Sequence, residues 1–338
     1  MIFVVGNSRS GTTMAGRILG RSPEVHTFGE LHFFEHMVDS VQVRQRPELS
    51  QRDAEALVRR LLTSSRQDFF ATVEPQSYAD DVQRILTSIE SQDAVSLYRT
   101  TLAFETARAG AQIPCEQTPR YLFFLDEILD AIPHARVIVM IRDPRAVLVS
   151  QANKWRRRFL GATNIPRREA LRAWSNYHPL LTTKLWESCS KVARRHAKDE
   201  RVMEVRFEDL VASPEKLVRA MAAHTNVPFT EDMLAVPQVG SSHGKDAPET
   251  LGINPQMGSS WRSGGLSRTD IALCEWLAGD EMQARGYALE GEGKFPPGAL
   301  PSMAKLAGKM SVAVPMNLSR TKNLRETLRR RFKKDLDE

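Results

Sequence analysis

Residues 6–13, GNSRSGTT, are the first group whose types and spacing could do chemistry. Gly6 and Gly11 enclose four residues, directly after a short apolar run. A glycine-rich turn between a strand and a helix points several backbone N–H groups at one place, which suits a phosphate. A triphosphate loop usually has a lysine where this sequence has Thr12, whereas the cation inside this loop is Arg9. An ordinary strand–turn–helix junction is the plain alternative. The sequence Arg-Ser-Gly-Thr-Thr directly after an apolar strand favours an anion site.

A second group of the same kind follows the clearest candidate for a buried strand, the apolar run at residues 137–141. Arg142 comes directly after this run, and Ser150 lies eight residues further on. The guanidinium of an arginine is a planar fork of donors that matches a phosphate. Ser150, about two helical turns further, adds a hydroxyl donor. The sequence therefore predicts a second anion contact here.

Alternating strands and helices must position these residues. Strands are predicted at 2–5, 25–28, 137–141 and 201–207. Helices are predicted at 14–19, within 50–110, and at 122–131, 145–155, 167–197, 214–224 and 269–284, with a long loop at 236–268. This alternation predicts an α/β fold with a parallel, doubly wound sheet, in which ligands lie beyond the carboxyl ends of the strands. Both groups of residues fall at that edge.

The two motifs, in this order, resemble sulfotransferases that use 3′-phosphoadenosine 5′-phosphosulfate. VVGNSRSGTTM is similar to the 5′-phosphosulfate loop of that family, and RVIVMIRDPRAVLVSQ is similar to its 3′-phosphate motif. The resemblance implies a sulfotransferase domain at 1–290, with a P-loop-type parallel sheet flanked by helices, helical insertions over the acceptor site, and no metal. The donor contacts that it implies are Arg9, Ser10, Gly11, Thr12, Thr13, Arg142, Ser150, Phe207 and Arg262.

The resemblance also implies two catalytic residues, Glu30 and Arg9. Glu30, in TFGELHFF, stands 21 residues after Arg9, where several branches of the family carry a glutamate as general base. A carboxylate at this edge can accept the proton of an acceptor hydroxyl if partial burial raises its pKa. A surface or helix-capping glutamate is the plain alternative, and His32 and His36 are the other candidate bases.

Gln117 stands where many relatives with the following Thr-Pro pair carry a lysine. Arg9 or Arg120 is expected to supply the missing charge. Two other functions remain open, a P-loop kinase or triphosphatase with a variant loop and an inactive nucleotide-binding protein. The missing lysine and the Arg142/Ser150 pair argue against the kinase or triphosphatase.

The acceptor is expected to carry a hydroxyl. A carbohydrate or a lipid-linked sugar, as in a glycolipid, is the first hypothesis, followed by peptidyl tyrosine or another metabolite hydroxyl. The basic residues Lys154, Arg156, Arg157 and Arg158 could attract an anionic acceptor, or they form a solvated loop.

Composition sets the remaining expectations. The chain has 338 residues, of which 41% are hydrophobic and 26% charged, which suits a globular protein. Its three cysteines are widely spaced and form no metal-binding pattern, and no secretory signal or run of ~18 apolar residues is present. A cytoplasmic location is therefore predicted.

The net charge of +6 lies in residues 305–338, which hold ten Lys or Arg and four Asp or Glu. The rest of the chain is neutral, so no nucleic-acid partner is expected. Residues 291–338 are predicted to form a linker and a basic helical tail, in which NLRETLRRRFKK has an apolar stripe among cations. This tail is expected either to lie peripherally on the inner membrane surface or to dock on its own domain or on a partner subunit.

Overall fold

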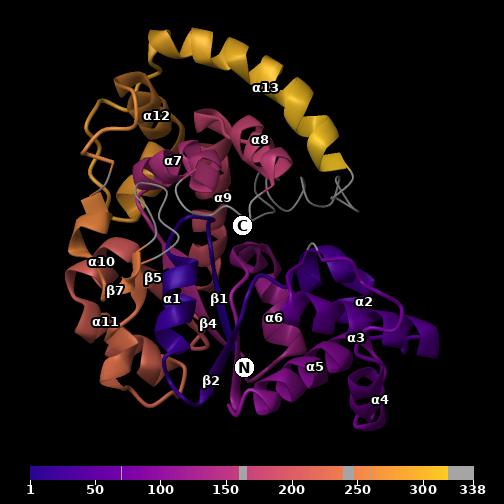
Figure 1. The fold of residues 1–338 in the computed structure, drawn as a ribbon. Helices are drawn as coiled ribbons and strands as arrows, with labels where there is room; N and C mark the ends of the chain where they lie inside the picture. Colours follow the sequence, from indigo (N-terminus) through magenta and orange to yellow (C-terminus); the bar gives the residue numbers. More distant parts are fainter. Residues whose placement is uncertain (70, 160–165, 239–246, 260, 319–338) are drawn as a thin grey trace.

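The computed structural model describes residues 1–69, 71–159, 166–238, 247–259 and 261–318. A parallel sheet of five strands, in the order β2-β3-β1-β4-β5, lies at its centre (Figure 1). The strands are β1 (Ile2–Gly6), β2 (Val25–Phe28), β3 (Ile113–Glu116), β4 (Arg136–Ile141) and β5 (Val202–Arg206). Gly6 is in register with Met140, so the carboxyl ends of β1 and β4 lie side by side. The predicted α/β fold with a parallel sheet is confirmed.

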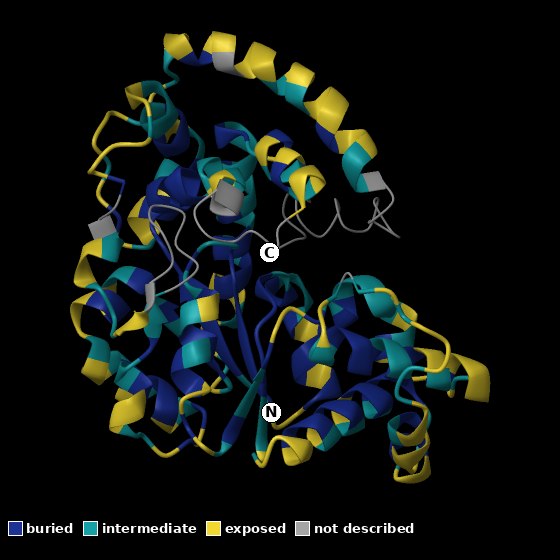
Figure 2. Cartoon of the chain, viewed as in Figure 1, coloured by how far each residue is buried: buried dark blue, intermediate teal, exposed yellow. Residues whose placement is uncertain are grey.

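The central strands are buried on both faces because successive side chains point to opposite sides of a sheet. Phe3 and Val5 of β1 belong to one apolar core, and Val4 belongs to a second core on the opposite face. Val139 and Ile138 of β4 divide between the two cores in the same way. The unbroken apolar runs in the sequence thus reflect two helical layers (Figure 2).

Helices form both layers. The layer on the Val4 side contains α1 (Thr12–Leu19), α10 (Phe207–Ala212) and α11 (Pro214–His224). The layer on the Phe3 side contains α2 (Ser40–Arg44), α3 (Gln51–Arg66), α4 (Ala79–Thr87), α5 (Ala94–Arg108), α6 (Leu125–Ala131), α7 (Pro144–Ala152), α9 (Pro179–His196) and α12 (Arg268–Ala284). Beyond the edge of the sheet, α13 (Leu300–Leu318) packs against α8 (Arg167–Ser175) (Figure 1).

Several predicted boundaries are wrong. Strand β3 was not predicted, although it pairs with both β1 and β2. The predicted loop at 236–268 contains an antiparallel pair, β6 (Pro237–Gln238) and β7 (Ala247–Leu251), and a 3-10 turn, η5 (Pro255–Ser259). The helix predicted at 145–155 ends at Ala152, and the helical stretch at 167–197 is interrupted between α8 and α9.

The predicted amphipathic segment NLRETLRRRFKK lies outside the described residues, as do the side chains of Arg157 and Arg158. Residues 297–318 contain a short turn, η6 (Pro297–Ala299), and α13. In the described part of the chain, no helix combines the length and the apolar character needed to cross a bilayer.

Candidate active site

The phosphate loop follows β1 and fits tightly against its neighbours. Gly6 has φ +146°, and a Cβ there would lie 2.4 Å from the carbonyl oxygen of Met140. Gly11 caps the start of α1 with φ +94°, and a Cβ there would lie 2.4 Å from the ring of Phe207. Both glycines are therefore required by space as well as by backbone conformation.

Several donors of this loop fit an anion. Ser10 is fully buried and Asn7 is nearly so, yet Ser10 Oγ and Asn7 Nδ2 have no hydrogen-bond partner among the described residues. Buried polar atoms of this kind are costly unless something pairs with them. Thr13 is exposed in the first turn of α1, whereas the buried Thr12 accepts a hydrogen bond from Gln117 Nε2 at 3.3 Å. The residues present thus fit the phosphate group that the sequence implies.

The two sequence motifs meet at Arg9. Its Nε donates to Ser150 Oγ at 2.8 Å, across 141 residues of sequence. Arg142 donates from one guanidinium nitrogen to the carbonyl oxygen of Arg9 at 3.1 Å and from the other to that of Met257 at 2.8 Å. Arg9 itself has φ 74°, a left-handed conformation that costs energy for a residue with a side chain. Two cationic side chains and a hydroxyl are therefore gathered at the ends of β1 and β4.

Phe207 and Arg262 are the other two residues expected to contact the sulfuryl donor. The ring of Phe207 is 1% exposed and lies against Gly11, with the guanidinium of Arg142 at 4.1 Å from its centre. Phe207 thus supports the loop from beneath, and its expected contact with adenine stays a prediction. Arg262 is exposed, lies over Trp261 and is 3.8 Å from Glu290, so its phosphate contact also stays a prediction.

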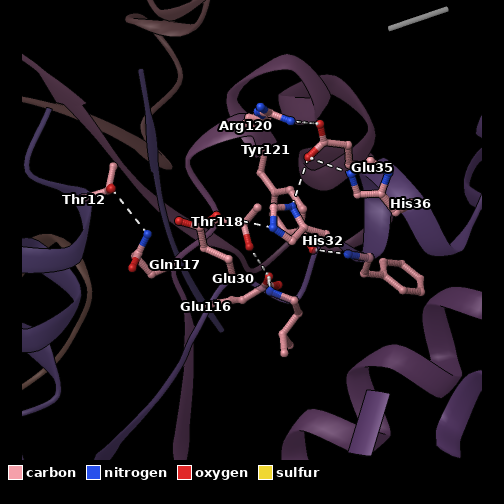
Figure 3. A network of polar contacts seen from close by, with 12 residues as sticks. Thr12, Glu30, His32, Glu35, His36, Glu116, Gln117, Thr118, Arg120 and Tyr121 are labelled. Carbon is pink, nitrogen blue, oxygen red and sulfur yellow. Dashed lines mark hydrogen bonds and ion pairs between the residues drawn. The ribbon is translucent and has the colours of Figure 1, made fainter. Parts of the chain in front are cut away.

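The candidate base Glu30 follows β2 and contacts His32 (Figure 3). Half of its side chain is exposed, and one carboxylate oxygen lies 3.3 Å from His32 Nε2. Desolvation raises the pKa of Glu30, but the hydrogen bond and charge of His32, followed by the charges of Lys154 and Arg120, outweigh it and lower the pKa. The condition named above, a pKa raised by burial, is therefore not met. Glu30 is instead held ionised.

His32 bridges two carboxylates. Its Nδ1 lies 3.0 Å from Glu35, and its Nε2 faces Glu30. Burial alone lowers the pKa of His32, but the hydrogen bonds to Glu30 and Glu35 raise it to about 9. A histidine that is protonated at neutral pH does not accept a further proton, so this geometry favours Glu30 over His32 as the base.

Glu35 is the centre of this network. It lies in a π-helical turn, η1 (Phe33–Met37), and accepts a hydrogen bond from Arg120 at 2.8 Å. Ligand atoms of His32, Glu35 and His36 lie within 4.8 Å of one another, a set that could hold a metal. Here both ring nitrogens of His32 contact carboxylates and Arg120 binds Glu35, so the group forms a network of ion pairs.

Lys154 links the base to the phosphate loop. It begins a short turn, η3 (Lys154–Phe159), and its side chain reaches solvent although protein surrounds it on most sides. Desolvation by the surrounding protein and the charge of Arg9 lower the pKa of Lys154, Glu30 opposes them, and the result is a pKa of about 8. The charges of Arg9 and Glu30 thus both act on Lys154.

Glu116 is a functional candidate that the sequence reasoning missed. It is fully buried at the end of β3 and accepts hydrogen bonds from the backbone N–H of Leu31 at 3.3 Å and from Thr118 Oγ1 at 2.7 Å. The hydroxyl of Tyr98 also donates to it. Burial raises the pKa of Glu116 to about 7, against the effect of these hydrogen bonds. Through Leu31, Glu116 positions the segment that carries Glu30 and His32.

Comparison with known proteins identifies the family of this chain. The sequence profile of the sulfotransferase family matches residues 2–231, which include Arg9, Glu30 and Arg142. The chain belongs to the sulfotransferase family. This family member is 23% identical over 241 residues to protein-tyrosine sulfotransferase 1 of Danio rerio. The aligned region covers 69% of the chain and 55% of the relative. The chain thus spans about half the length of that curated relative.

Solved structures of sulfotransferases are distantly similar to this family member. The sulfotransferase domain from the curacin biosynthetic pathway is 17% identical, with a TM-score of 0.49, covering 86% of this chain and 98% of that domain. The sulfotransferase domain of the olefin synthase of Synechococcus PCC 7002 is 21% identical, with a TM-score of 0.48, covering 82% of this chain and 94% of that domain.

Proposed function

We propose that this sulfotransferase-family protein transfers the sulfuryl group of 3′-phosphoadenosine 5′-phosphosulfate to a hydroxyl of an acceptor. The observation that carries the proposal is the junction at Arg9, which contacts both Ser150 and Arg142. This junction gathers the two halves of a donor site that could hold a 5′- and a 3′-phosphate. Glu30 lies close enough to interact with Lys154, which also interacts with Arg9.

The donor is held by the loop and by the two arginines. The backbone N–H groups at the start of α1, with Ser10 and Thr13, hold the 5′-phosphate. Arg142 and Ser150 hold the 3′-phosphate. In the structure Arg142 donates to the carbonyl oxygens of Arg9 and Met257, and Ser150 accepts a hydrogen bond from the side chain of Arg9. A guanidinium forms stronger hydrogen bonds with a phosphate than with a neutral carbonyl, which favours the exchange.

Glu30 acts as the general base. Its carboxylate accepts the proton of the acceptor hydroxyl while that oxygen forms a bond to sulfur and the bond from sulfur to the 5′-phosphate oxygen breaks. The bonding electrons pass to the phosphate, where Arg9 stabilises the added negative charge. His32 keeps Glu30 ionised and orients its carboxylate.

Lys154 supplies the charge expected at Gln117. Gln117 itself contacts Thr12 and so supports the loop, and Arg120 is paired with Glu35. The charges of Arg9 and Glu30 both act on Lys154, and its side chain reaches solvent, so this flexible side chain can approach the transferring group. We assign it to the leaving phosphate, together with Arg9.

A carbohydrate or a lipid-linked sugar is the first acceptor to test. The relative named protein-tyrosine sulfotransferase 1 makes a tyrosine-containing peptide the second. The test is transfer from labelled donor to a panel of both kinds of acceptor. One acceptor that gains label in proportion to enzyme supports the proposal. Label that reaches neither kind of acceptor contradicts the acceptor class.

The role of Glu30 is tested with Glu30→Gln. We expect transfer to fall by about 10²–10⁴-fold because the amide cannot accept the proton. Binding of adenosine 3′,5′-bisphosphate should not change. Glu215→Gln is the matched control, because Glu215 is a similarly exposed surface glutamate that pairs with Arg219. Undiminished transfer by Glu30→Gln contradicts the assignment, and His32 is then the next base to test.

A further inference from the structure

A buried arginine lies next to the predicted 3′-phosphate motif and has no role in the reaction described above. Arg145 is in the first turn of α7, three residues after Arg142, and is 1% exposed. Its Nε and one terminal nitrogen donate to the two carboxylate oxygens of Asp143 at 3.0 and 2.7 Å. Its other terminal nitrogen donates to Glu275 at 2.8 Å, and the guanidinium lies 4.0 Å from the centre of the Trp261 ring.

The ion pairs of Arg145 fix geometry more than they add stability. Asp143 and Glu275 are 5% and 1% exposed, so all three charges are removed from water. The cost of desolvating such charges roughly cancels their attraction, and an apolar cluster of similar size is often as stable. A guanidinium that binds a carboxylate through two nitrogens does, however, fix the direction of both groups. The cluster therefore determines how the segments that carry these side chains lie relative to one another.

Arg145 joins four segments of the chain. Glu275 lies on α12, which packs against α7 (Figure 1). The carboxylate of Glu275 also accepts hydrogen bonds from the backbone N–H groups of Glu290 and Gly291, both at 2.9 Å. Trp261 follows the turn η5 in the sequence. The start of α7, α12, the segment after α12 and the segment after η5 therefore meet at Arg145.

The first connection from Arg145 to Arg142 runs through Asp143. The peptide group between Arg142 and Asp143 is held on both sides. Its carbonyl oxygen accepts a hydrogen bond from Trp186 Nε1 at 2.8 Å, and its N–H donates to Glu208 at 2.9 Å. Arg145 in turn holds the side chain of Asp143. The backbone from which the Arg142 side chain extends is therefore fixed at three points.

The second connection runs through η5. The carbonyl oxygen of Met257, in this turn, accepts a hydrogen bond from the guanidinium of Arg142 at 2.8 Å. Trp261 lies four residues further on and contacts the guanidinium of Arg145. A shift of Trp261 would therefore move the carbonyl group that orients Arg142.

We propose that Arg145 positions Arg142 for the 3′-phosphate and so sets the preference of the site for nucleotides that carry one. The inference rests on the proposed function, in which Arg142 and Ser150 hold that phosphate. Arg145 does not itself contact the nucleotide, because it is buried and its three nitrogens donate to Asp143 and Glu275. A guanidinium binds two phosphate oxygens only in one orientation, so a small rotation of Arg142 loses a hydrogen bond.

Calorimetric titration of the full chain with adenosine 3′,5′-bisphosphate and with adenosine 5′-phosphate tests the role of Arg145. The ratio of the two affinities measures what the 3′-phosphate contributes. Arg145→Met should reduce this ratio by about tenfold or more, the worth of a hydrogen bond to a charged group, and leave binding of adenosine 5′-phosphate unchanged. A role in stability alone would lower the folded fraction and weaken binding of both nucleotides by one factor. An unchanged ratio therefore overturns the proposal.

Arg66→Met is the matched control. Arg66 also bridges two carboxylates, those of Glu105 and Asp81, and its guanidinium lies 4.6 Å from the centre of the Tyr78 ring. These residues belong to α3, α4 and α5 and the start of α4, away from the residues assigned to the nucleotide. The control should keep the wild-type ratio. A ratio that falls equally in both variants would reflect the loss of any such ion pair, and the role of Arg145 would be refuted.

Arg145→Lys tests the same role if Arg145→Met does not fold. Lysine keeps the charge, but its single ammonium group cannot reproduce the planar fork that binds Asp143 and Glu275 together. The lysine variant should bind adenosine 5′-phosphate as the wild type does and lose part of the preference for the bisphosphate. A wild-type ratio in this variant contradicts the proposal.

Two comparisons separate this inference from the proposed function. In an Arg142→Gln background, Arg145→Met should cause no further loss of the ratio, because Arg145 acts through Arg142. A further loss there overturns the inference alone, as does a wild-type preference that survives in the Arg145 variants. A wild-type protein that binds both nucleotides equally contradicts the 3′-phosphate site of the proposed function and, with it, the role of Arg145.

Discussion

Replacement of Gly11 by alanine tests how the phosphate loop is supported. The added Cβ would lie 2.4 and 2.8 Å from two ring carbons of Phe207, whereas nonbonded carbons are normally ~3.5–4.0 Å apart. Phe207 has little room to retreat, since its ring is 1% exposed and lies 4.1 Å from the guanidinium of Arg142. Overpacking of this kind costs ~1–3 kcal/mol, and the left-handed φ of 94° adds ~1–2 kcal/mol. We expect Gly11→Ala to lose ~2–5 kcal/mol of unfolding free energy.

Urea denaturation and calorimetric binding of adenosine 3′,5′-bisphosphate measure this effect. Gly110→Ala is the matched control, because Gly110 also has a positive φ, 77°, but no atom lies within 4 Å of its added Cβ. The control should lose only the ~1–2 kcal/mol of backbone strain and bind the nucleotide normally. In a Phe207→Ala background, the cost of Gly11→Ala should shrink. The reasoning is refuted if Gly11→Ala costs no more than Gly110→Ala and leaves nucleotide binding intact.

Two further predictions concern the titrating groups near the base. His32→Gln removes the charge that lowers the pKa of Glu30, so the pKa of Glu30 rises. The acidic limb of the pH profile of kcat/KM should then move to higher pH. If that limb does not move, the role of His32 is contradicted. Burial raises the pKa of Glu116 from 4.5 to about 7, so the fold favours the neutral form. Protonated Glu116 therefore contributes to the free energy of unfolding. The contribution is complete below the pKa of the unfolded chain, 4.5, and is lost as pH rises through about 7, a change of about 3 kcal/mol. Glu116→Gln should remove that part of the pH dependence of urea unfolding, and an unchanged pH dependence contradicts it.

Four strands could be predicted from sequence because their own residues determine them. β1 and β4 are unbroken apolar runs with β-branched residues, as buried parallel strands require. β3 could not be predicted, because its sequence, IPCE, is short and contains a proline and a glutamate. Pairing with β1 and β2 on either side determines its conformation. The long loop at 236–268 was misjudged in the same way, since β6 and β7 form by pairing with each other.

The candidate site, too, could be predicted from the sequence only where its residues belong to local motifs. Arg9, Arg142 and Ser150 could be predicted because each belongs to a local strand–turn–helix motif, and a parallel sheet brings such motifs to one edge. The surroundings of Glu30 could not be predicted. His32 changes the direction of its pKa shift, and Glu116 reaches its segment across 85 residues of sequence. The contact of Glu116 follows from the pairing of β2 with β3, in which Phe28 is in register with Glu116, and no local pattern reports that pairing.

Calorimetry of nucleotide binding in the absence of magnesium tests the central claim most directly. If Arg9 and the loop hold a 5′-phosphate while Arg142 and Ser150 hold a 3′-phosphate, adenosine 3′,5′-bisphosphate binds much more tightly than ATP or adenosine 5′-phosphate. Arg142→Gln should then remove most of the preference for the 3′-phosphate. Tighter binding of ATP than of the bisphosphate, dependent on magnesium, would contradict the account and indicate a kinase or triphosphatase instead.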